Sequence, residues 1–115
     1  MAAAHSCVAE VDIEDLYPAV LNHATQSQYV REIGAKYFGA EKVKSADLPL
    51  TASEDFSYFL EEKPGCFFML GTKQKGQNYC LHTSYYDYND SMIGSGGYMF
   101  VRIVEERLGV KIIQE

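Results

Sequence analysis

Residues 64–71 read Pro64-Gly65-Cys66-Phe67-Phe68-Met69-Leu70-Gly71, which is a continuous apolar run between two glycines. A strand that is apolar on both sides is typical of the interior of a sheet whose faces are covered by helices. The sequence before the run predicts a short helix, and the sequence near the C-terminus predicts a longer one. Together these patterns predict an α/β fold in which the run is a strand of a helix-covered sheet.

The short helix is expected to begin near Thr51, because Thr51-x-x-Glu54 matches a capping box. Glu54 and Asp55 then place negative charge in the first turn, where the helix dipole favours it. Pro64-Gly65 ends this helix. Its predicted apolar face consists of Phe56, Phe59 and Leu60.

The N-terminal region predicts a strand followed by a helix. Residues 7–13 alternate strictly between apolar and acidic side chains, which is the pattern of a half-buried strand. A helix is predicted over residues 24–38, with a capping box at Thr25-x-x-Gln28 and a left-handed end at Gly39. Its predicted apolar face consists of Val30, Ile33 and Tyr37. Residues 41–50 show no periodicity and read as a connector, so a domain boundary is predicted there, between residues 1–45 and 46–115.

The last helix is preceded or opened by the glycine cluster at residues 94–97 and ends at Gly109. Its predicted apolar stripe is Phe100, Ile103, Val104 and Leu108, or alternatively Met99, Ile103 and Leu108. The charged side chains Arg102, Glu105, Glu106 and Arg107 are expected to face outward. Residues 110–113 are expected to add a short edge strand.

Composition narrows the function. The 115 residues carry a formal net charge of −6, which argues against a nucleic-acid surface. No apolar run approaches the roughly 18 residues of a membrane span, and the first residues do not resemble a secretion signal. The three cysteines form no CxxC pair, so we expect free thiols and a reducing compartment such as the cytoplasm.

The densest group of chemically capable side chains is Cys80-x-His82 followed by Asp87 and Asp90. In an extended segment Cys80 and His82 point to the same side, and imidazole is the commonest zinc ligand. A histidine in a turn is, however, more often a surface residue, and Asp87 and Asp90 equally suit a turn or a helix cap. Glu54 also has two readings with Asp55: first-turn acids of a helix, or hydrogen-bond acceptors beside His82.

Three motifs occur in a characteristic order: residues 51–57 (TASEDFS), residues 64–72 (PGCFFMLGT) and residues 81–90 (LHTSYYDYND). This order closely resembles the C-terminal part of metal-dependent amidohydrolases. The branch is that of hippurate hydrolase, N-acyl-amino-acid amidohydrolase and auxin-conjugate hydrolase, within the aminoacylase/carboxypeptidase metallopeptidases. Residues 10–22 also resemble the end of the family's smaller lid domain, so the resemblance spans nearly the whole chain.

The resemblance implies a catalytic α/β domain that carries two metal ions, zinc or manganese, with an inserted lid domain that often mediates dimerisation. Residues 1–45 would end the α+β lid, and residues 46–115 would close the catalytic sheet. His82 matches the family's last metal ligand. Asn22 lies where the family has a residue near the substrate carboxylate. Glu54 and Asp55, and more weakly Asp87, are expected to support the metal ligand or the local structure.

The family's other metal ligands and its general-base glutamate lie in an N-terminal half that this sequence does not match. We therefore expect this chain alone to be inactive and to hold no zinc tightly, because a catalytic zinc needs about three protein ligands. Its expected partners are that N-terminal half or another protein chain, with an N-acyl amino acid as substrate, and homo-oligomerisation is a further expectation. The alternative is a non-catalytic binding or scaffold subunit derived from the same fold.

Overall fold

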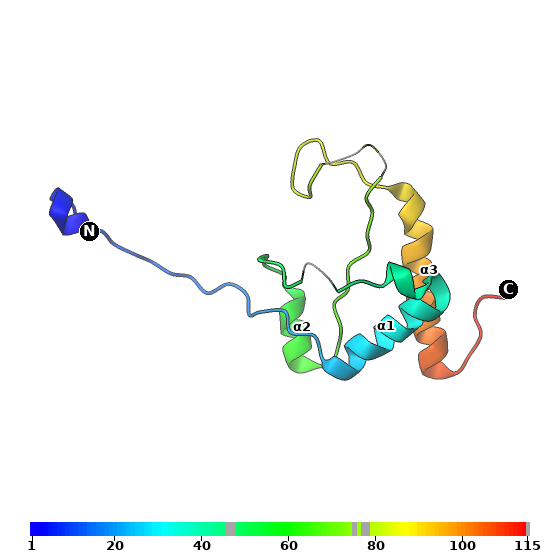
Figure 1. The fold of residues 1–115 in the computed structure, drawn as a ribbon. Helices are drawn as coiled ribbons and strands as arrows, with labels where there is room; N and C mark the ends of the chain where they lie inside the picture. The colour runs from blue at the N-terminus through cyan, green and yellow to red at the C-terminus, as the bar shows by residue number, and fades with distance from the viewer. Residues whose placement is uncertain (46–47, 75, 77–78, 115) are drawn as a thin grey trace.

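The computed structural model describes residues 1–45, 48–74, 76 and 79–114. Its elements are a 3-10 helix η1 (Ala2–His5), helix α1 (Ala24–Phe38), a 3-10 turn η2 (Ala40–Lys42), helix α2 (Phe56–Glu62), a 3-10 turn η3 (Asp90–Met92) and helix α3 (Ile93–Leu108). Figure 1 shows α1 crossing α3, α2 standing apart from α3, and residues 7–22 running away from the helices as an extended segment.

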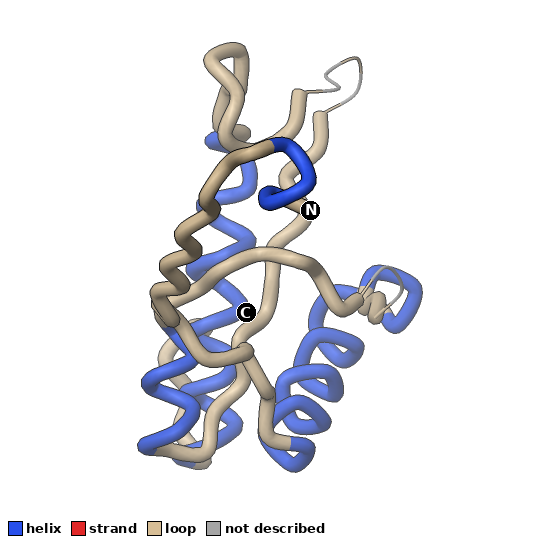
Figure 2. Tube along the Cα trace, turned by 90° about the vertical axis from the view of Figure 1, so that its left-hand side faces the viewer, coloured by secondary structure: helices blue, strands red, loops and turns tan. Residues whose placement is uncertain are grey.

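The predicted α/β fold is wrong: the described residues contain no strand (Figure 2). A strand requires a neighbouring backbone to complete its ladder of hydrogen bonds, and among the described residues none of the three predicted strands has one. Residues 7–13 are all exposed, with Val11 at 77% of its free surface. The run at residues 66–70 lies beside helices, where Phe68 contacts the ring of Phe100 at 5.5 Å. The alternation and the apolar run are present in the sequence, but neither supplies the neighbouring backbone with which a strand must pair.

Helix α1 covers residues 24–38 as predicted, but its start is made differently. The capping residue is His23, whose backbone N–H donates to the carbonyl of Gly65 at 3.1 Å, and no side chain caps the helix. The predicted capping box at Thr25 is therefore wrong. At the other end the N–H of Gly39 donates to the carbonyl of Ala35, with a φ of 100° that favours glycine. Its ψ of 137° lies outside the left-handed region that we predicted.

Helix α2 begins at Phe56, later than the capping box at Thr51 predicts. Glu54 still stabilises this start, because its Oε1 accepts the N–H of Phe56 at 3.2 Å and its carbonyl accepts the Ser57 hydroxyl at 2.8 Å. Leu60 is buried as predicted, whereas Phe59 is exposed.

Helix α3 includes the glycine cluster and ends at Gly109, which adopts the predicted left-handed conformation. Its buried residues are Met99, Arg102 and Glu105. The predicted stripe is therefore wrong at Phe100, Val104 and Leu108, which are all exposed; Met99, from the alternative stripe, is buried.

Two further predictions, about the charged residues of α3 and about the segment after it, are also wrong. Arg102 and Glu105 were expected to face outward, yet they are 5% and 4% exposed. Residues 110–113 form no strand, because the N–H groups of Ile112 and Ile113 donate to the Glu105 carboxylate.

Helices α1 and α3 pack through aromatic and small residues. The hydroxyl of Tyr29 donates to the Ile103 carbonyl at 3.1 Å, and the ring of Tyr98 lies 5.6 Å from that of Phe38. Gly34 permits the close approach of Val43, which follows η2, since a Cβ there would lie 3.0 Å from Cγ2 of Val43; the same Cβ would lie 3.9 Å from Cε of Met99 on α3. The predicted domain boundary borders residues 46–47, which lie outside the described residues, and it stays a prediction.

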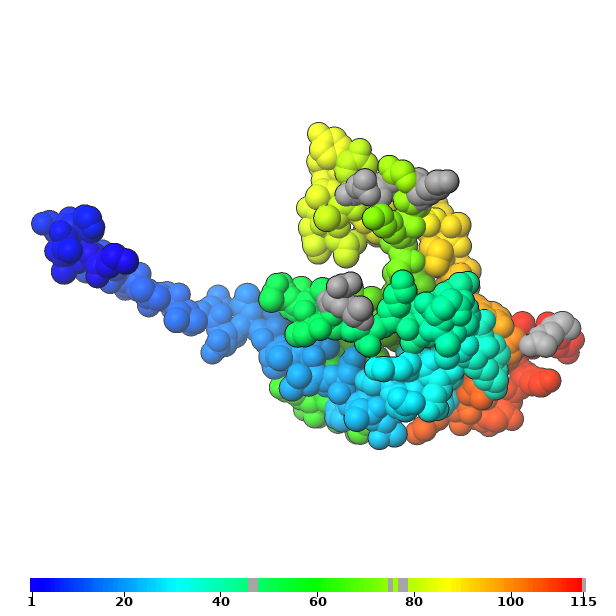
Figure 3. All heavy atoms as spheres, viewed as in Figure 1, coloured from blue at the N-terminus to red at the C-terminus, as the bar shows by residue number. Residues whose placement is uncertain are grey.

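The molecule exposes far more surface than a compact protein of its size. Its accessible surface is 10,152 Å², against about 6,300 Å² for a compact protein of this mass. The radius of gyration is 19.9 Å, against about 13 Å. Figure 3 shows the two contributors, the extended N-terminal segment and a lobe around residues 80–88 that stands clear of the helices. No helix in the described ranges is both long and apolar enough to cross a membrane.

Candidate functional site

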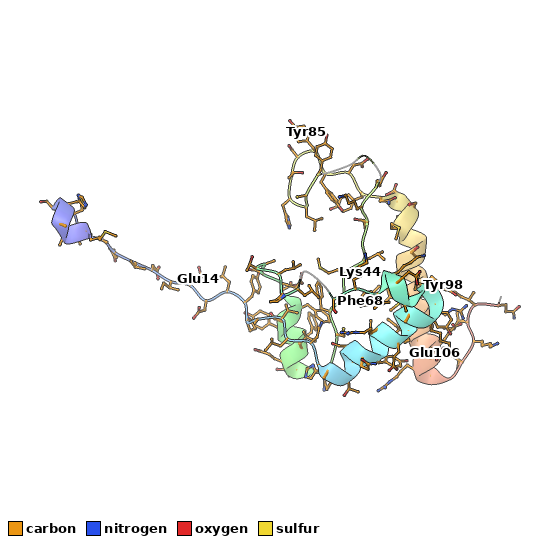
Figure 4. All side chains as sticks on the ribbon, viewed as in Figure 1. Glu14, Lys44, Phe68, Tyr85, Tyr98 and Glu106 are labelled. Carbon is orange, nitrogen blue, oxygen red and sulfur yellow. The ribbon has the colours of Figure 1, made fainter. Side chains whose placement is uncertain are left out.

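His82 lies in an exposed turn within the long connection between residues 66–74 and α3. Its φ of 65° is left-handed, which is uncommon for a residue with a side chain. The turn is closed by two local hydrogen bonds, from the Thr83 hydroxyl to the Cys80 carbonyl at 3.0 Å and from the Tyr86 N–H to the Thr83 carbonyl at 3.1 Å. Figure 4 marks Tyr85 at the far end of this loop. The sequence therefore presents the imidazole at a projecting turn.

The base of this loop is anchored to Thr72, in the segment before the loop. The Tyr86 and Thr72 hydroxyls lie 3.2 Å apart, and the Asn89 side-chain amide donates to the Thr72 carbonyl at 3.2 Å. Asn89 also caps η3, since its Oδ1 accepts the Ser91 hydroxyl at 2.6 Å and the Ser91 N–H at 3.3 Å. These contacts fix where the loop begins and ends while the His82 turn remains accessible.

The residues that the structure describes do not build a complete metal site. Within the described part of the chain, no three His, Cys, Asp or Glu side chains converge on a point that could hold a metal ion. Cys80, His82 and Asp87 are all exposed. A catalytic zinc takes about three protein ligands and a water. The role of His82 as a metal ligand stays a prediction.

Glu54 and Asp55 lie at the start of α2, where Glu54 bonds the backbone of that helix. Among the described residues no hydrogen bond or ion pair joins either acid to the His82 turn. The first-turn prediction is therefore wrong, because Asp55 is the N-cap residue of α2, Glu54 precedes it, and the first turn of the helix contains no acid. The predicted role of these acids beside His82 stays a prediction.

Asn22 lies at the joint between α1 and residues 65–67. Its Oδ1 accepts the N–H of Phe67 at 2.6 Å, and its Nδ2 donates to the Phe67 carbonyl at 2.8 Å. Next to it, the Gly65 N–H donates to Nδ1 of His23 at 3.2 Å. The carboxamide thereby takes the place that a neighbouring backbone would occupy in a ladder. Its predicted contact with a substrate carboxylate stays a prediction.

Sequence reasoning missed a polar cluster where the C-terminal halves of α1 and α3 meet. Lys36 and Tyr37 of α1 each donate to Oε1 of Glu106 at 2.5 Å. Arg102 pairs with Glu105 at 2.7 Å, and its guanidinium lies 4.6 Å from the Tyr37 ring and 4.8 Å from the Tyr98 ring. Figure 4 marks Tyr98 and Glu106 on α3. We call these residues the α1–α3 polar cluster: Lys36, Tyr37, Tyr98, Arg102, Glu105 and Glu106.

The contacts in this cluster shift the acid–base behaviour of its members. The backbone N–H groups of Ile113 and Ile112 lower the pKa of Glu105 below its ordinary value. Hydrogen bonds from Lys36 and Tyr37 lower the pKa of Glu106, and the same contacts with Glu106 raise the pKa values of Lys36 and Tyr37. A hollow of about 670 Å³ lies beside these side chains. The one sequence signal for it was the opposite charge of Arg102 and Glu105 three residues apart on a helix.

Comparison with known proteins places these features in a family. Residues 5–106 match the model of peptidase family M20/M25/M40. The chain is 33% identical to IAA-amino acid hydrolase ILR1-like 2 of Arabidopsis thaliana over 101 residues, which cover 83% of this chain and 23% of that protein. It is 30% identical to thermostable carboxypeptidase 1 of Saccharolobus solfataricus, over 73% of this chain and 21% of that protein. It is 23% identical to hippurate hydrolase of Campylobacter jejuni, over 90% of this chain and 26% of that protein.

No solved structure matches the chain. The chain spans about a fifth to a quarter of the length of these relatives. The matched residues contain all three motifs on which the resemblance was based, including His82. That resemblance is confirmed: the chain belongs to peptidase family M20/M25/M40.

Proposed function

We propose that this chain is the C-terminal portion of a metal-dependent amidohydrolase that cleaves the amide bond of N-acyl amino acids. The observation that carries the proposal is the family match over residues 5–106. The names of two relatives, an IAA-amino acid hydrolase and a hippurate hydrolase, support an N-acyl amino acid as the substrate class. The covered share of these relatives, about a quarter, supports a role as one portion of a larger catalytic unit.

In this proposal His82 supplies one imidazole ligand to a divalent metal, zinc or manganese, whose other ligands come from polypeptide outside this sequence. The exposed turn and its anchored base suit a ligand presented to another part of a protein. Because one ligand cannot hold a catalytic metal, the chain by itself is proposed to be inactive. Asn22 remains a candidate for contact with the substrate carboxylate, which would have to share or displace its two bonds to Phe67.

The test joins this chain to the N-terminal portion of hippurate hydrolase, truncated where the present sequence begins to match. The mixture is measured for bound zinc or manganese and for glycine released from hippurate. We expect reconstituted activity that falls at least about a hundredfold in His82→Ala, since loss of a metal ligand disables the site. The matched control is His5→Ala, an exposed histidine of η1, which should leave activity unchanged.

Two results would contradict the proposal. If His82→Ala leaves both metal content and glycine release unchanged in an active mixture, His82 is no ligand. If the two portions form a stable complex with full metal content and hydrolyse no N-acyl amino acid, the substrate class is wrong.

A second candidate is a non-catalytic binding or scaffold subunit, favoured by the large exposed surface. The exposed large apolar residues include Met69, Leu70 and Phe100, so another protein could cover them. This candidate predicts that the chain binds a partner protein tightly while His82→Ala changes neither binding nor any activity of the complex.

A further inference from the structure

Glu105 accepts hydrogen bonds through both its backbone carbonyl and its side-chain carboxylate. Its carbonyl accepts the N–H groups of Gly109 at 2.8 Å and Val110 at 3.2 Å, which turn the chain back at the end of α3. Its carboxylate Oε1 then accepts the N–H groups of Ile112 at 2.5 Å and Ile113 at 2.8 Å. These bonds to Glu105 hold the segment that follows α3 against the helix. We call residues 110–114 the C-terminal strap.

The same carboxylate reaches the contact between α1 and α3. Its Oε2 accepts from Nη1 of Arg102 at 2.7 Å, and both residues are at most 5% exposed. The Arg102 guanidinium lies 4.6 Å from the centre of the Tyr37 ring of α1 and 4.8 Å from the centre of the Tyr98 ring of α3, which are distances typical of cation–π contacts. The two rings also contact each other edge-on, with centroids 6.0 Å apart. Arg102 is therefore held both by Glu105, which binds the strap, and by the Tyr37 ring of α1.

These contacts form a chain of dependence. If the strap leaves, Oε1 of Glu105 loses two donors and its carboxylate becomes accessible to water, which competes for Oε2. Arg102 then loses one of the contacts that hold its guanidinium against the two rings. The predicted cost falls on α1, although no residue of α1 touches Glu105 through a hydrogen bond among the described residues.

We propose that Glu105 is a latch for the C-terminal strap, and that the latch is coupled through Arg102 to the packing of α1 on α3. Binding of the strap to Glu105 thereby strengthens the packing of α1 on α3. The proposal concerns the conformation of this chain and stands apart from the proposed hydrolase activity.

The test is amide hydrogen exchange on the full 115-residue chain, with Glu105→Gln and Ile112→Pro compared with the wild type. The Glu105→Gln change weakens the acceptor, whereas Ile112→Pro removes one donor and leaves the carboxylate intact. The matched control is Glu61→Gln, an exposed carboxylate of α2. We expect exchange at Ile113 and over residues 34–38 of α1 to rise about tenfold in both variants, and the α2 amides to remain unchanged.

Each alternative result overturns part of the proposal. Faster exchange at Ile113 with unchanged residues 34–38 removes the coupling. Unchanged exchange at Ile113 removes the latch. If amide exchange in the Ile112→Pro variant rises equally in α1, α2 and the strap, the variant unfolds globally, which contradicts a local latch.

Discussion

The paired hydrogen bonds of Asn22 lead to a prediction that can be worked from the structure. Asn22→Ala removes the acceptor for the Phe67 N–H at 2.6 Å and the donor to the Phe67 carbonyl at 2.8 Å. A neutral hydrogen bond contributes about 0.5–1.5 kcal/mol net, and Asn22 is exposed, so the two bonds together are worth about 1–2 kcal/mol. The opening of the joint at residues 65–67 should become roughly 5- to 30-fold more frequent.

The measurement is the exchange rate of the Phe67 amide by NMR, with Gln28→Ala as the control. Gln28 is also an amide side chain, but its bond to Glu32 stays within α1. We expect Phe67 to exchange faster in Asn22→Ala and to remain at the wild-type rate in Gln28→Ala. Equal Phe67 exchange in the wild type and Asn22→Ala would refute the role assigned to the carboxamide.

Asn22→Asp sharpens the same test. An ionised carboxylate keeps an acceptor for the Phe67 N–H but turns an oxygen toward the Phe67 carbonyl, so protection should be lost at neutral pH. A protonated carboxyl group can both donate and accept, as the carboxamide does. Protection of Phe67 relative to Asn22→Ala should therefore return below about pH 4, the ordinary range of an aspartic acid.

Three further predictions follow from packing and charge. Ile33→Ala, at a residue 3% exposed, should lower the free energy of unfolding in urea by about 2–4 kcal/mol, and a loss below about 1 kcal/mol would show that Ile33 is not a core residue. Gly94→Ala, where an added Cβ meets nothing within 4 Å, should raise the thermal midpoint through better helix propensity, whereas Gly34→Ala should gain less or lose, because its Cβ would lie 3.0 Å from Val43; equal gains would contradict the close packing. The contribution of Glu105 and Glu106 to folding is present above the ordinary carboxyl pKa of 4.5 and should be lost as pH falls through their lowered pKa values. The contribution of Lys36 and Tyr37 is present below their ordinary pKa values, 10.5 and 10.0, and should be lost as pH rises through the raised values. The free energy of unfolding in urea, measured from acid to alkaline pH, should therefore be highest and nearly constant near neutrality. If Glu106→Gln leaves the losses at acid and alkaline pH unchanged, this assignment is contradicted.

The helices were the most predictable part of the fold, because their signals are local. The α1 range and the left-handed end at Gly109 were predicted from residues within one turn of each boundary. The capping box at Thr25 failed where a distant contact forms, since the Gly65 carbonyl accepts the N–H of His23 at the start of α1. The capping box at Thr51 failed because α2 begins only at Phe56, where Glu54 makes local bonds.

The strands failed for the opposite reason. A strand is defined by a neighbour that lies elsewhere in the chain or in another chain, and neither the alternation at residues 7–13 nor the apolar run at 66–70 names that neighbour. Asn22 occupies part of the place with a side chain, an arrangement for which the sequence offers no periodic signal.

The candidate site divides in the same way. The motif around His82 was sufficient for the family, because the order of motifs survives even where the local fold is not predicted. The α1–α3 polar cluster was missed because charged residues on a helix are ordinarily read as solvent-facing. Only an explicit search for opposite charges at helical spacing would have marked Arg102 and Glu105 as a buried pair.

Dissolved salts should weaken one kind of interaction in this molecule and strengthen another. The first is the ion pair between Lys36 and Glu106, and the second is the association of the exposed apolar side chains. Sodium chloride screens the exposed pair, whose side chains retain 59% and 31% of their free surface. Ammonium sulfate instead promotes the withdrawal of apolar groups from water. Chloride should therefore leave the polypeptide dispersed, with a weaker contact between α1 and α3. Sulfate should instead favour self-association that buries the exposed apolar side chains.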